Sequence, residues 1–503
     1  MHIITHFFWF VLPPSHARRF FFFILFLTSC KSPNLNDPCD PSSEKSRERL
    51  LLNTISRQFT SFCGLNSNNN ANSLGSKIIT SFRFASGQTG LNKDYVGSIS
   101  GTNINIEIPY GLGLNLVPTF EFTGKSVSVG SVEQTSASTI NNFASNSIYT
   151  VTAFDGTTQN YTVNVYQITP VADTGQTNCF NYGTPASCAT TSASFPNQDG
   201  ELQNFPNAKG TQPITTNSGY PNDPINKDTL KGIVWKTCHE GQTGSGCAGT
   251  ASNLDHTSAT TACNNLNSLN SGAGYAGLKN WRLPSIQELN QLMEYNGSTN
   301  NTNYWNSTLF PNPPSSNTSP FAWSSSTLIG AGAAMSHNNQ YITNTATSSF
   351  NRAHCVSGFP QPSFDMVDNG NGTILDKRTK LIWQKCALGQ TNDASCTGTP
   401  SLQNWSNSLL GCKNLTLAGK SWRLPNVNEM VTLLDLSLLS TQKINATYFP
   451  NFSAAGVAYD TSSANQQNVV YNQMFMPSAP EFQGISGKGV SNNYNARCVA
   501  GPE

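Results

Sequence analysis

The chain has 503 residues, of which only 11% are charged, and its formal net charge is +1. An ordinary soluble domain is about 25% charged. A nucleic-acid-binding protein needs a surplus of Lys and Arg to neutralise phosphates, so this composition argues against nucleic-acid binding. Disorder is also disfavoured, because 10% of the residues are aromatic and the net charge is close to zero. The length predicts about three domains.

The N-terminus carries the features of an export signal. Arg18 and Arg19 precede a short apolar run that ends in Leu27-Thr28-Ser29-Cys30. This pattern is typical of a signal peptide, here residues 1–29, and the run is too short for the roughly 20 residues of a membrane-spanning helix. The last four residues resemble the bacterial lipobox, which implies a lipid anchor on Cys30. We therefore expect a bacterial cell-envelope location, lipid-anchored in the outer membrane and surface-exposed. The alternatives are an ordinary secretory signal or a buried N-terminal helix.

The next two segments differ in pattern. Residues 30–73 are expected to form a lipidated tether with a short helix within residues 42–62. Residues 74–170 alternate apolar and polar side chains in several short runs, which predicts strands of a β-sandwich. Asp155-Gly156 predicts a hairpin turn between the last two strands. The runs that alternate most clearly are Ile104–Ile108, Val127–Val129, Tyr149–Thr152 and Tyr161–Val165. The last two runs and their turn resemble Ig-like modules of bacterial surface lipoproteins.

The C-terminal half contains the same ordered motif twice. Each occurrence has a Trp-x-x-Cys block, two further cysteines, a Trp-Arg-Leu-Pro-x-x-x-Glu block and a terminal Cys-Val. The first occurrence comprises Trp235, Cys238, Cys247, Cys263, Trp281–Pro284, Glu288 and Cys355. The second comprises Trp383, Cys386, Cys396, Cys412, Trp422–Pro425, Glu429 and Cys498. These are two copies of one domain, called copy one and copy two below, and each is too long to be a short solenoid repeat.

Both copies share predicted elements. In copy two, residues 373–375 and 381–383 are expected to be strands joined by a turn. Residues 405–415 predict a helix with Trp405, Ser408 and Cys412 on one face. A second helix follows each Trp-Arg-Leu-Pro block. Its N-cap and N3 residues are Ser285 with Glu288 in copy one, and Asn426 with Glu429 in copy two.

These motifs resemble the Lcl C-terminal domain family over about residues 173–503. The start of copy one, residues 174–179 with 198–200, also resembles that family's usual opening. The positions of the helix Cys, the second-helix Glu and the last-strand Cys are further similar to C-type-lectin-like domains. The resemblance implies an α+β and all-β protein: an N-terminal β-sandwich followed by two disulfide-stapled C-type-lectin-like domains. We expect these domains at residues 171–359 and 360–503.

Twelve cysteines follow Cys30, an even number that allows six disulfides in an oxidising compartment. The resemblance implies two long-range staples, each closing a loop of about 90 residues and worth roughly 4–5 kcal/mol in the chain-entropy model. It also implies four local pairs. The implied pairs are Cys263–Cys355, Cys412–Cys498, Cys238–Cys247, Cys386–Cys396, Cys179–Cys188 and Cys39–Cys63.

Other chemistry has weaker support. Cys238-His239-Glu240 could bind zinc, but copy two has Cys386-Ala387-Leu388 there, so a disulfide hairpin is favoured. Glu288 and Glu429 could act as general acids, but helix capping explains both. We expect no metal, no cofactor and no enzymatic activity. The glutamate and asparagine triplets that bind calcium and sugar in lectins are missing, so calcium-dependent sugar binding is not predicted.

Two arginines have open roles. Arg282 and Arg423 are expected to pair with internal carboxylates, with Asp228 and Asp376 as candidates, or with loop carbonyls. Alternatively they contact a ligand.

Three aromatic residues are candidates for ligand binding. Trp305 and Trp323 lie in predicted loops of copy one, and Tyr459 aligns with Trp323 in copy two. An exposed aromatic ring can stack on a sugar or anchor a partner protein. Packing in the core is the alternative.

The sequence therefore predicts a surface lipoprotein that is a non-enzymatic binding protein or adhesin for host or matrix glycans, glycoproteins or proteins. The absence of dense Lys and Arg clusters argues against strong polyanion binding. The alternatives are a structural envelope lipoprotein without a soluble ligand, or an enzyme on a lectin-like fold.

Overall fold

A computed structural model describes the chain from residue 74 to residue 502. The ranges left out within it are 89–90, 92, 182–183, 192–193, 296–304, 314–321, 329–332, 338–341, 439–442, 452–456, 466–468, 476–485 and 490–492. The predicted anchor on Cys30, the helix within residues 42–62 and the pair Cys39–Cys63 lie outside the described residues. The chain divides into two compact units, residues 1–76 and 77–503.

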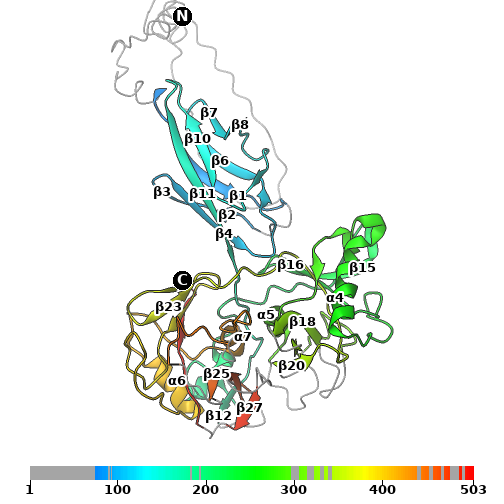
Figure 1. Ribbon diagram of the computed structural model, residues 1–503, viewed down its shortest axis with the longest axis vertical. Coiled ribbons are helices and arrows are strands. Elements are labelled where there is room, and N and C mark those ends of the chain that lie inside the picture. The colour runs from blue at the N-terminus through cyan, green and yellow to red at the C-terminus, as the bar shows by residue number, and fades with distance from the viewer. Residues whose placement is uncertain are drawn as a thin grey trace, which may run out of the picture. The chain divides into compact units, whose positions relative to one another are not determined.

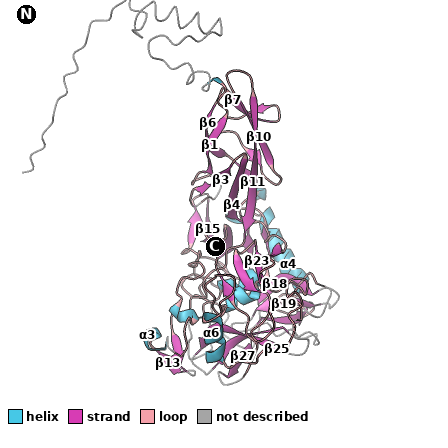
Figure 2. Cartoon of the chain, turned by 90° about the vertical axis from the view of Figure 1, so that its left-hand side faces the viewer, coloured by secondary structure: helices cyan, strands magenta, loops and turns pink. Residues whose placement is uncertain are grey.

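Strands dominate the second unit, and the helices are few and short (Figure 2). Among the described residues, no helix is long and apolar enough to cross a membrane.

The N-terminal part of this unit is a pair of β-sheets. Three strands form one sheet in the order β2-β1-β6, and six form the other in the order β3-β4-β11-β10-β7-β8. All four alternating runs predicted from the sequence lie in strands. The strands are β1 (Ile78–Phe84), β2 (Tyr95–Val96), β3 (Ser98–Ser100), β4 (Asn103–Pro109), β5 (Asn115–Leu116), β6 (Pro118–Thr123), β7 (Ser126–Val129), β8 (Val132–Glu133), β9 (Asn141–Asn142), β10 (Ser147–Thr152) and β11 (Thr158–Ile168).

One apolar core joins the two sheets into a sandwich. Alternate residues of β4 and β10 are buried, as strand periodicity requires. Phe82 of one sheet meets Tyr149 of the other with ring centroids 5.1 Å apart, edge to face. The predicted turn at Asp155-Gly156 joins β10 and β11, which pair in an antiparallel register. The predicted sandwich is therefore present.

Copy one is built around a five-stranded sheet in the order β14-β15-β16-β21-β17, with a second, three-stranded sheet β18-β19-β20. Its strands are β14 (Thr215–Asn217), β15 (Tyr220–Asp228), β16 (Ile233–Lys236), β17 (Trp281–Arg282), β18 (Ala322–Leu328), β19 (Ala333–His337), β20 (Ile342–Ala346) and β21 (Val356–Ser357). Its helices are α4 (His256–Asn265), α5 (Ile286–Leu292) and the 3-10 turns η2 (Leu266–Ser268), η3 (Asn270–Gly272) and η4 (Tyr275–Gly277).

Copy two repeats this plan with a sheet β22-β23-β24-β28 and a three-stranded sheet β25-β26-β27. Its strands are β22 (Met366–Asp368), β23 (Thr373–Asp376), β24 (Leu381–Gln384), β25 (Val457–Asn465), β26 (Val469–Phe475), β27 (Ser486–Gly489) and β28 (Val499–Ala500). Its helices are α6 (Trp405–Lys413) and α7 (Val427–Val431). The predicted helix from Trp405 ends two residues earlier than expected, at Lys413.

Local sequence signals explain these helices. Asp255 and Asn404 cap α4 and α6 by accepting a hydrogen bond from a backbone N–H of the first turn. Ser285 with Glu288, and Asn426 with Glu429, form complete capping boxes at α5 and α7. Each box satisfies two backbone donors at a buried helix end.

Five disulfides occur in the described residues, and they join the pairs that the family resemblance implies. Two close long loops, with sequence separations of 92 and 86 residues, and each fixes a helix to the final strand of its copy. The other three separations are 9 or 10 residues. The pairs are Cys263–Cys355, Cys412–Cys498, Cys179–Cys188, Cys238–Cys247 and Cys386–Cys396.

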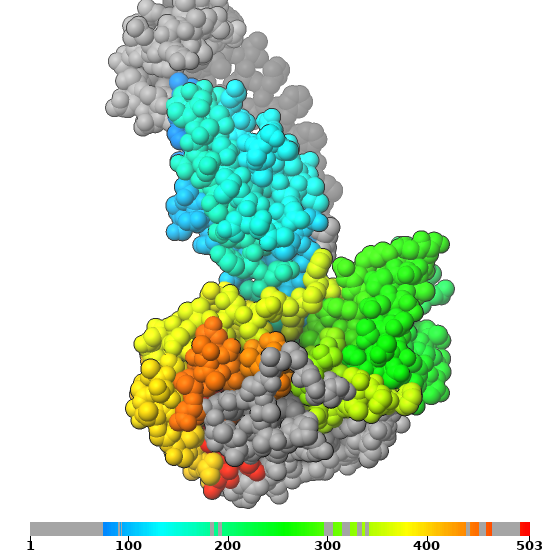
Figure 3. Space-filling view, viewed as in Figure 1, coloured from blue at the N-terminus to red at the C-terminus, as the bar shows by residue number. Residues whose placement is uncertain are grey.

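The two copies share one hydrophobic core. Helices α5 and α7 lie side by side where the copies meet (Figure 1). Asn290 of α5 donates a hydrogen bond from Nδ2 to Oδ1 of Asn428, 2.8 Å away and buried. Leu289 and Met430 belong to the same apolar cluster. The surfaces of the two copies therefore run into each other without a break (Figure 3).

The segment that enters copy one contacts copy one and also packs on copy two. Phe180 of β12 (Cys179–Asn181) lies in the core of copy two with Trp405. Oδ2 of Asp199 accepts hydrogen bonds from Thr174 and from Ser463 of β25. The segment's remaining elements are β13 (Thr184–Ala186), α3 (Cys188–Thr191) and η1 (Asp199–Glu201). Residues 171–206, which were expected to belong to the first of the two stapled domains, therefore contact both copies.

Candidate functional site

The three aromatic side chains predicted to meet a ligand are buried. Trp305 is 5% exposed, Trp323 0% and Tyr459 1%. The indole Nε1 of Trp323 donates a hydrogen bond to the carbonyl of Leu254, 2.8 Å away. A stacking role at the surface is therefore corrected to a packing role. The segments that carry these residues fold back over the core, and aromatic rings gain most from such burial.

The two arginines of the repeated block pair with the capping glutamates, and not with the predicted aspartates. Arg282 donates from Nη1 and Nη2 to the two oxygens of Glu288, at 2.8 and 2.7 Å. Arg423 forms the same two-pronged pair with Glu429. Burial alone would raise the pKa of Glu288, but the adjacent Arg282 guanidinium lowers it below its usual value. Each pair fixes the start of a helix against its sheet.

The predicted aspartates have other partners. Asp228 pairs with Lys231, with Nζ and Oδ2 3.0 Å apart. Asp376 pairs with Arg378 at 2.8 Å. Both carboxylates are buried, and they close the turns from β15 to β16 and from β23 to β24.

The predicted alternative of a zinc site at Cys238 does not fit the structure, because Cys238 is bonded to Cys247. Within the described part of the chain, no group of three or more His, Cys, Asp or Glu side chains is arranged to hold a metal ion.

A groove of about 880 Å³ lies between the sandwich and copy one. Its walls come from the segment after β4, from β14 to β16, from η4 and the residues after it, and from the end of β21. Sites for small ligands are typically recesses of about 300–1,000 Å³ and often lie where domains meet. The groove is therefore the candidate functional site.

Polar groups line the groove. Thr215, Thr216 and Asn217 of β14 are all exposed. Lys227 and Asn280 are also exposed and lie on the same lining. The glycine-rich backbone contributes further carbonyl and amide groups. Such a wall can offer hydroxyl, amide and ammonium groups to a hydrogen-bonding ligand.

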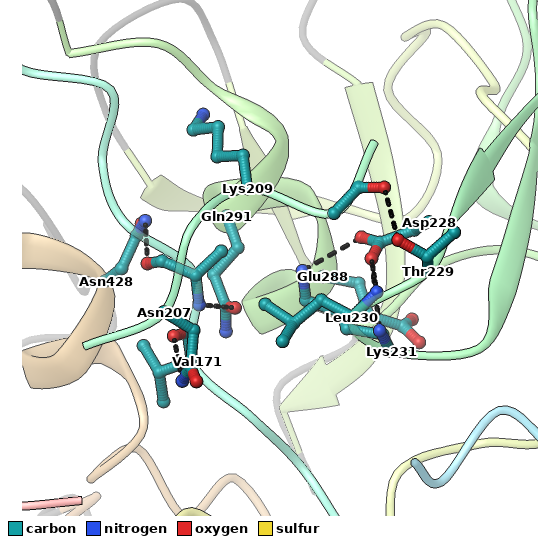
Figure 4. A network of polar contacts seen from close by, with 12 residues as sticks. Val171, Asn207, Lys209, Asp228, Thr229, Leu230, Lys231, Glu288, Gln291 and Asn428 are labelled. Atoms are coloured by element: carbon teal, nitrogen blue, oxygen red, sulfur yellow. Dashed lines mark hydrogen bonds and ion pairs between the residues drawn. The ribbon is translucent and has the colours of Figure 1, made fainter. Parts of the chain in front are cut away.

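The floor of the groove is held by the Asp228 carboxylate. Its Oδ1 accepts hydrogen bonds from the backbone N–H groups of Leu230 and Lys231, each at 3.1 Å. Lys231 adds the ion pair through Nζ, and the cluster lies close to Glu288 (Figure 4). Because this carboxylate already has these partners, it shapes the turn and does not present a free acid to the groove.

The sandwich side of the groove is anchored in copy one by a single tyrosine. Tyr110 follows β4 and is fully buried in the core that the two copies share. Its hydroxyl donates to Oε1 of Glu288 at 2.7 Å. The next residue, Gly111, donates its N–H to the carbonyl of Lys231, and a Cβ there would lie 2.5 Å from the carbonyl oxygen of Gly232. Only glycine fits this approach, so the wall is fixed in place.

The sequence interpretation missed the groove residues. One available signal was the hairpin between Thr211 and Asp228, which is longer than its counterpart between Met366 and Asp376. That extra length carries β14. The other signal was the run from Tyr110 to Gly113, whose two glycines lie between strands.

Comparisons with known proteins agree with this organisation. The Lcl C-terminal domain model matches residues 225–357 and 372–500, together more than half of the chain. The model described as SGBP, N-terminal, matches residues 79–165, which is the sandwich. No curated protein shows a significant match.

Two solved structures show local similarity. One is a protein assigned as secreted from Bacteroides fragilis, at 19% identity, covering 19% of this chain and 98% of that chain, with a TM-score of 0.14. The other is a protein assigned as a glycoside hydrolase from Bacteroides thetaiotaomicron, at 16% identity, covering 36% of this chain and 58% of that chain, with a TM-score of 0.16. At these TM-scores the two structures do not share an overall fold with this chain. On the family match, the chain belongs to the Lcl C-terminal domain family, with two copies of the domain.

Proposed function

We propose that this protein is a non-enzymatic glycan-binding protein of the bacterial cell envelope, and that the groove between the sandwich and copy one is its binding site. The observation that carries the proposal is a groove with fixed walls, in which exposed polar side chains stand beside aliphatic ones. The match of the sandwich to the SGBP N-terminal family, whose members are surface-associated and glycan-binding, supports the ligand class.

The lining suits a sugar chain. A glycan presents many hydroxyl groups, each both donor and acceptor, and the groove offers both kinds of partner at Thr215, Thr216 and Asn280. The wall is fixed by the Tyr110 contact before any ligand arrives, which lowers the ordering cost of binding.

The absence of enzymatic activity is part of the proposal. A glycoside hydrolase uses two carboxyl groups on either side of the scissile bond. In the described lining of the groove the carboxylate is Asp228, and it is held by Lys231 and two backbone N–H groups. Glu288 and Glu429 are each paired with an arginine.

The finer labels also belong to the proposal. We place the chain at the cell surface through a lipid on Cys30, with the sandwich as an Ig-like spacer. We likewise take the two stapled copies to be C-type-lectin-like.

A glycan array tests the proposed function. The full-length chain, with its disulfides formed, is screened against neutral and acidic host and matrix glycans at physiological ionic strength. We expect binding to a defined group of glycans. A blank array obtained with folded protein contradicts the proposal and favours a structural envelope lipoprotein.

A groove variant locates the binding site. Thr216→Trp places a large ring on the exposed side of β14 and is expected to reduce the array signal at least tenfold. Thr158→Trp is the matched control, because Thr158 is an exposed strand residue of the sandwich outside the groove lining. Equal binding by both variants would show that the binding site lies outside the groove.

A further inference from the structure

Copy one contains a pair of buried histidines that the groove does not use. His239 follows β16 and is 3% exposed, and His354 precedes β21 and is 0% exposed. Their ring centroids are 4.7 Å apart. The four ring nitrogens make no well-aligned hydrogen bond in the described structure, although the backbone of Ala353 lies within reach of His239. Buried polar groups without a partner are uncommon in folded proteins, so this pair needs an explanation.

Aromatic rings enclose the pair. The Trp305 ring lies 4.9 Å from His239 and 4.8 Å from His354, measured between centroids. Phe310 lies 5.1 Å from His354, and Trp235 stacks on it at 5.6 Å. This aromatic enclosure fits neutral imidazoles. An imidazolium here would lose its hydration, and the backbone of Ala353 offsets only part of that cost at His239.

The charged groups near the pair add to this preference. Lys236 on β16 and Arg352 before His354 both oppose a further positive charge. The nearest carboxylate, Glu240, lies 3.3 Å from the Lys236 ammonium. The segment Trp305–Asn312, which covers the pair, contains no titratable side chain. Burial first, and then Lys236 and Arg352, lower the pKa of His239 to about 3 against a smaller opposing effect of the Ala353 backbone. Burial first, and then His239 and Lys236, hold the pKa of His354 well below its usual value.

Copy two has different residues at the two corresponding positions. Its counterpart of His239 is Ala387, and its counterpart of His354 is Arg497. Arg497 is a permanent cation that donates to the carbonyl of Gln384 at 2.8 Å and lies over the Phe449 ring. A change of pH between 7 and 4 does not alter the charge of this arginine.

We propose that the His239–His354 pair makes copy one an acid-sensitive element: protonation of either imidazole weakens the packing of the Trp305–Asn312 segment, while copy two keeps its packing. The segment stays tethered by its far end, where Asn312 donates to the carbonyl of Cys247 at 3.0 Å. This inference stands independently of the proposed glycan function.

The direction of the pH dependence follows from linkage. Each histidine takes up a proton near pH 6.5 when its site is open but not until far lower pH when it is closed. The closed form therefore keeps its full stability above pH 6.5 and loses it as the pH falls toward 3. The ratio of open to closed segment should rise roughly tenfold per pH unit for each histidine, or about 100-fold for one histidine between pH 6.5 and 4.5.

Fluorine NMR of the full chain tests the proposal. The protein is labelled with 5-fluorotryptophan, and Trp305→Phe identifies the Trp305 resonance. Between pH 7.5 and 4.5 we expect that resonance to move toward the value of an exposed indole. The resonances of Trp383 and Trp405 in copy two should stay in place. Movement of all three together, or of none, would overturn the proposal.

Two variants of the histidine pair and one control variant show whether the pair causes the pH dependence. His239→Ala installs the residue of copy two and leaves one histidine, so the pH dependence of the Trp305 resonance should become about half as steep. His239→Leu with His354→Leu keeps the apolar volume and should abolish the dependence. His256→Gln is the control, because His256 lies outside the pair and bonds the carbonyl of Ser324. If this control removes the transition, or the double variant retains it, the pair is not the sensor.

Discussion

Copy one and copy two have the same framework but fill their cores with different chemistry. Trp305 of copy one corresponds to Ile444, because the next residue in each segment caps the same turn. Ala322 corresponds to Tyr459, since each forms the same parallel bridge to the final segment. At each of these two positions, one copy thus has a small side chain and the other copy a larger one. The two copies thus keep one framework, while the size, charge and titration behaviour of their core side chains differ.

A second exchange follows the same rule. His256 and Trp405 start the equivalent helices α4 and α6, and each bonds a carbonyl of the neighbouring strand. In copy one the indole comes from the strand, as Trp323, which packs against His256 at 5.2 Å. In copy two the strand has Asp460 at that place. The large ring has moved from strand to helix, which is why Trp323 and Tyr459 are not equivalent residues.

The first prediction compares the two long-range staples and has the largest expected effect. Cys263→Ala with Cys355→Ala should lower the free energy of unfolding by about 4–5 kcal/mol, and Cys412→Ala with Cys498→Ala by a similar amount. Because the copies share one core, urea denaturation of each variant should remain a single transition. The short pair Cys179–Cys188 provides the control, with a loss of about 2–3 kcal/mol. Two separate transitions would show that the copies fold independently.

The second prediction compares the buried ion pairs. Arg423→Met leaves Glu429 buried without its partner and should cost about 3–5 kcal/mol. Arg282→Met should cost less, because the Arg282 side chain is 19% exposed against 8% for Arg423. Denaturation curves measure both. Adding Glu429→Gln to the first variant should recover most of the loss, and failure to do so would assign the cost to packing.

The third prediction concerns Asp199, which joins the crossing segment to copy two. Burial raises its pKa to about 7. The folded protein therefore holds a proton there that the unfolded chain releases near pH 4, so stability falls as the pH rises from 4 to 7. Asp199→Asn can still accept from Thr174 and Ser463 and should be about 1–4 kcal/mol more stable than wild type at pH 8. The gain should vanish at pH 4. An equal gain at both pH values would contradict this assignment.

The fourth prediction concerns a substitution that weakens the contact between the sandwich and copy one. Tyr110→Phe removes the hydrogen bond to Glu288 and should cost about 1–2 kcal/mol. Tyr161→Phe is the control, since its hydroxyl makes only a long contact of 3.4 Å with the carbonyl of Lys77. Thermal denaturation measures both, and an equal effect would remove the special role of Tyr110.

The sequence predicted those features that depend on local or repeated patterns. The alternating strands, the capping boxes and the hairpin turns require only nearby residues, and all were found. An internal carboxylate or loop carbonyls were predicted as partners of Arg282, and both occur. Asp228 was the wrong carboxylate, because capping uses one oxygen of Glu288 and leaves the other free for a second donor. That free oxygen is visible only in three dimensions.

Burial in loops and packing across copies could not be predicted. Trp305 and Trp323 lie among polar residues in the sequence, and nothing local shows that their segments fold inward. The crossing of residues 174–206 onto copy two depends on distant contacts, such as Phe205 beneath the Arg423 guanidinium. The groove was missed for the same reason, because its walls come from segments far apart in the chain.

The groove lies between the sandwich and copy one, and the central claim is that it binds glycans. The most direct test is a calorimetric titration with an oligosaccharide that is positive on the array, using full-length wild type, Thr216→Trp and Leu402→Trp. Leu402 is exposed on copy two and lies outside the groove lining. We predict that Thr216→Trp weakens binding at least tenfold and that Leu402→Trp binds like wild type. Unchanged binding by Thr216→Trp, with its fold intact, would contradict the claim.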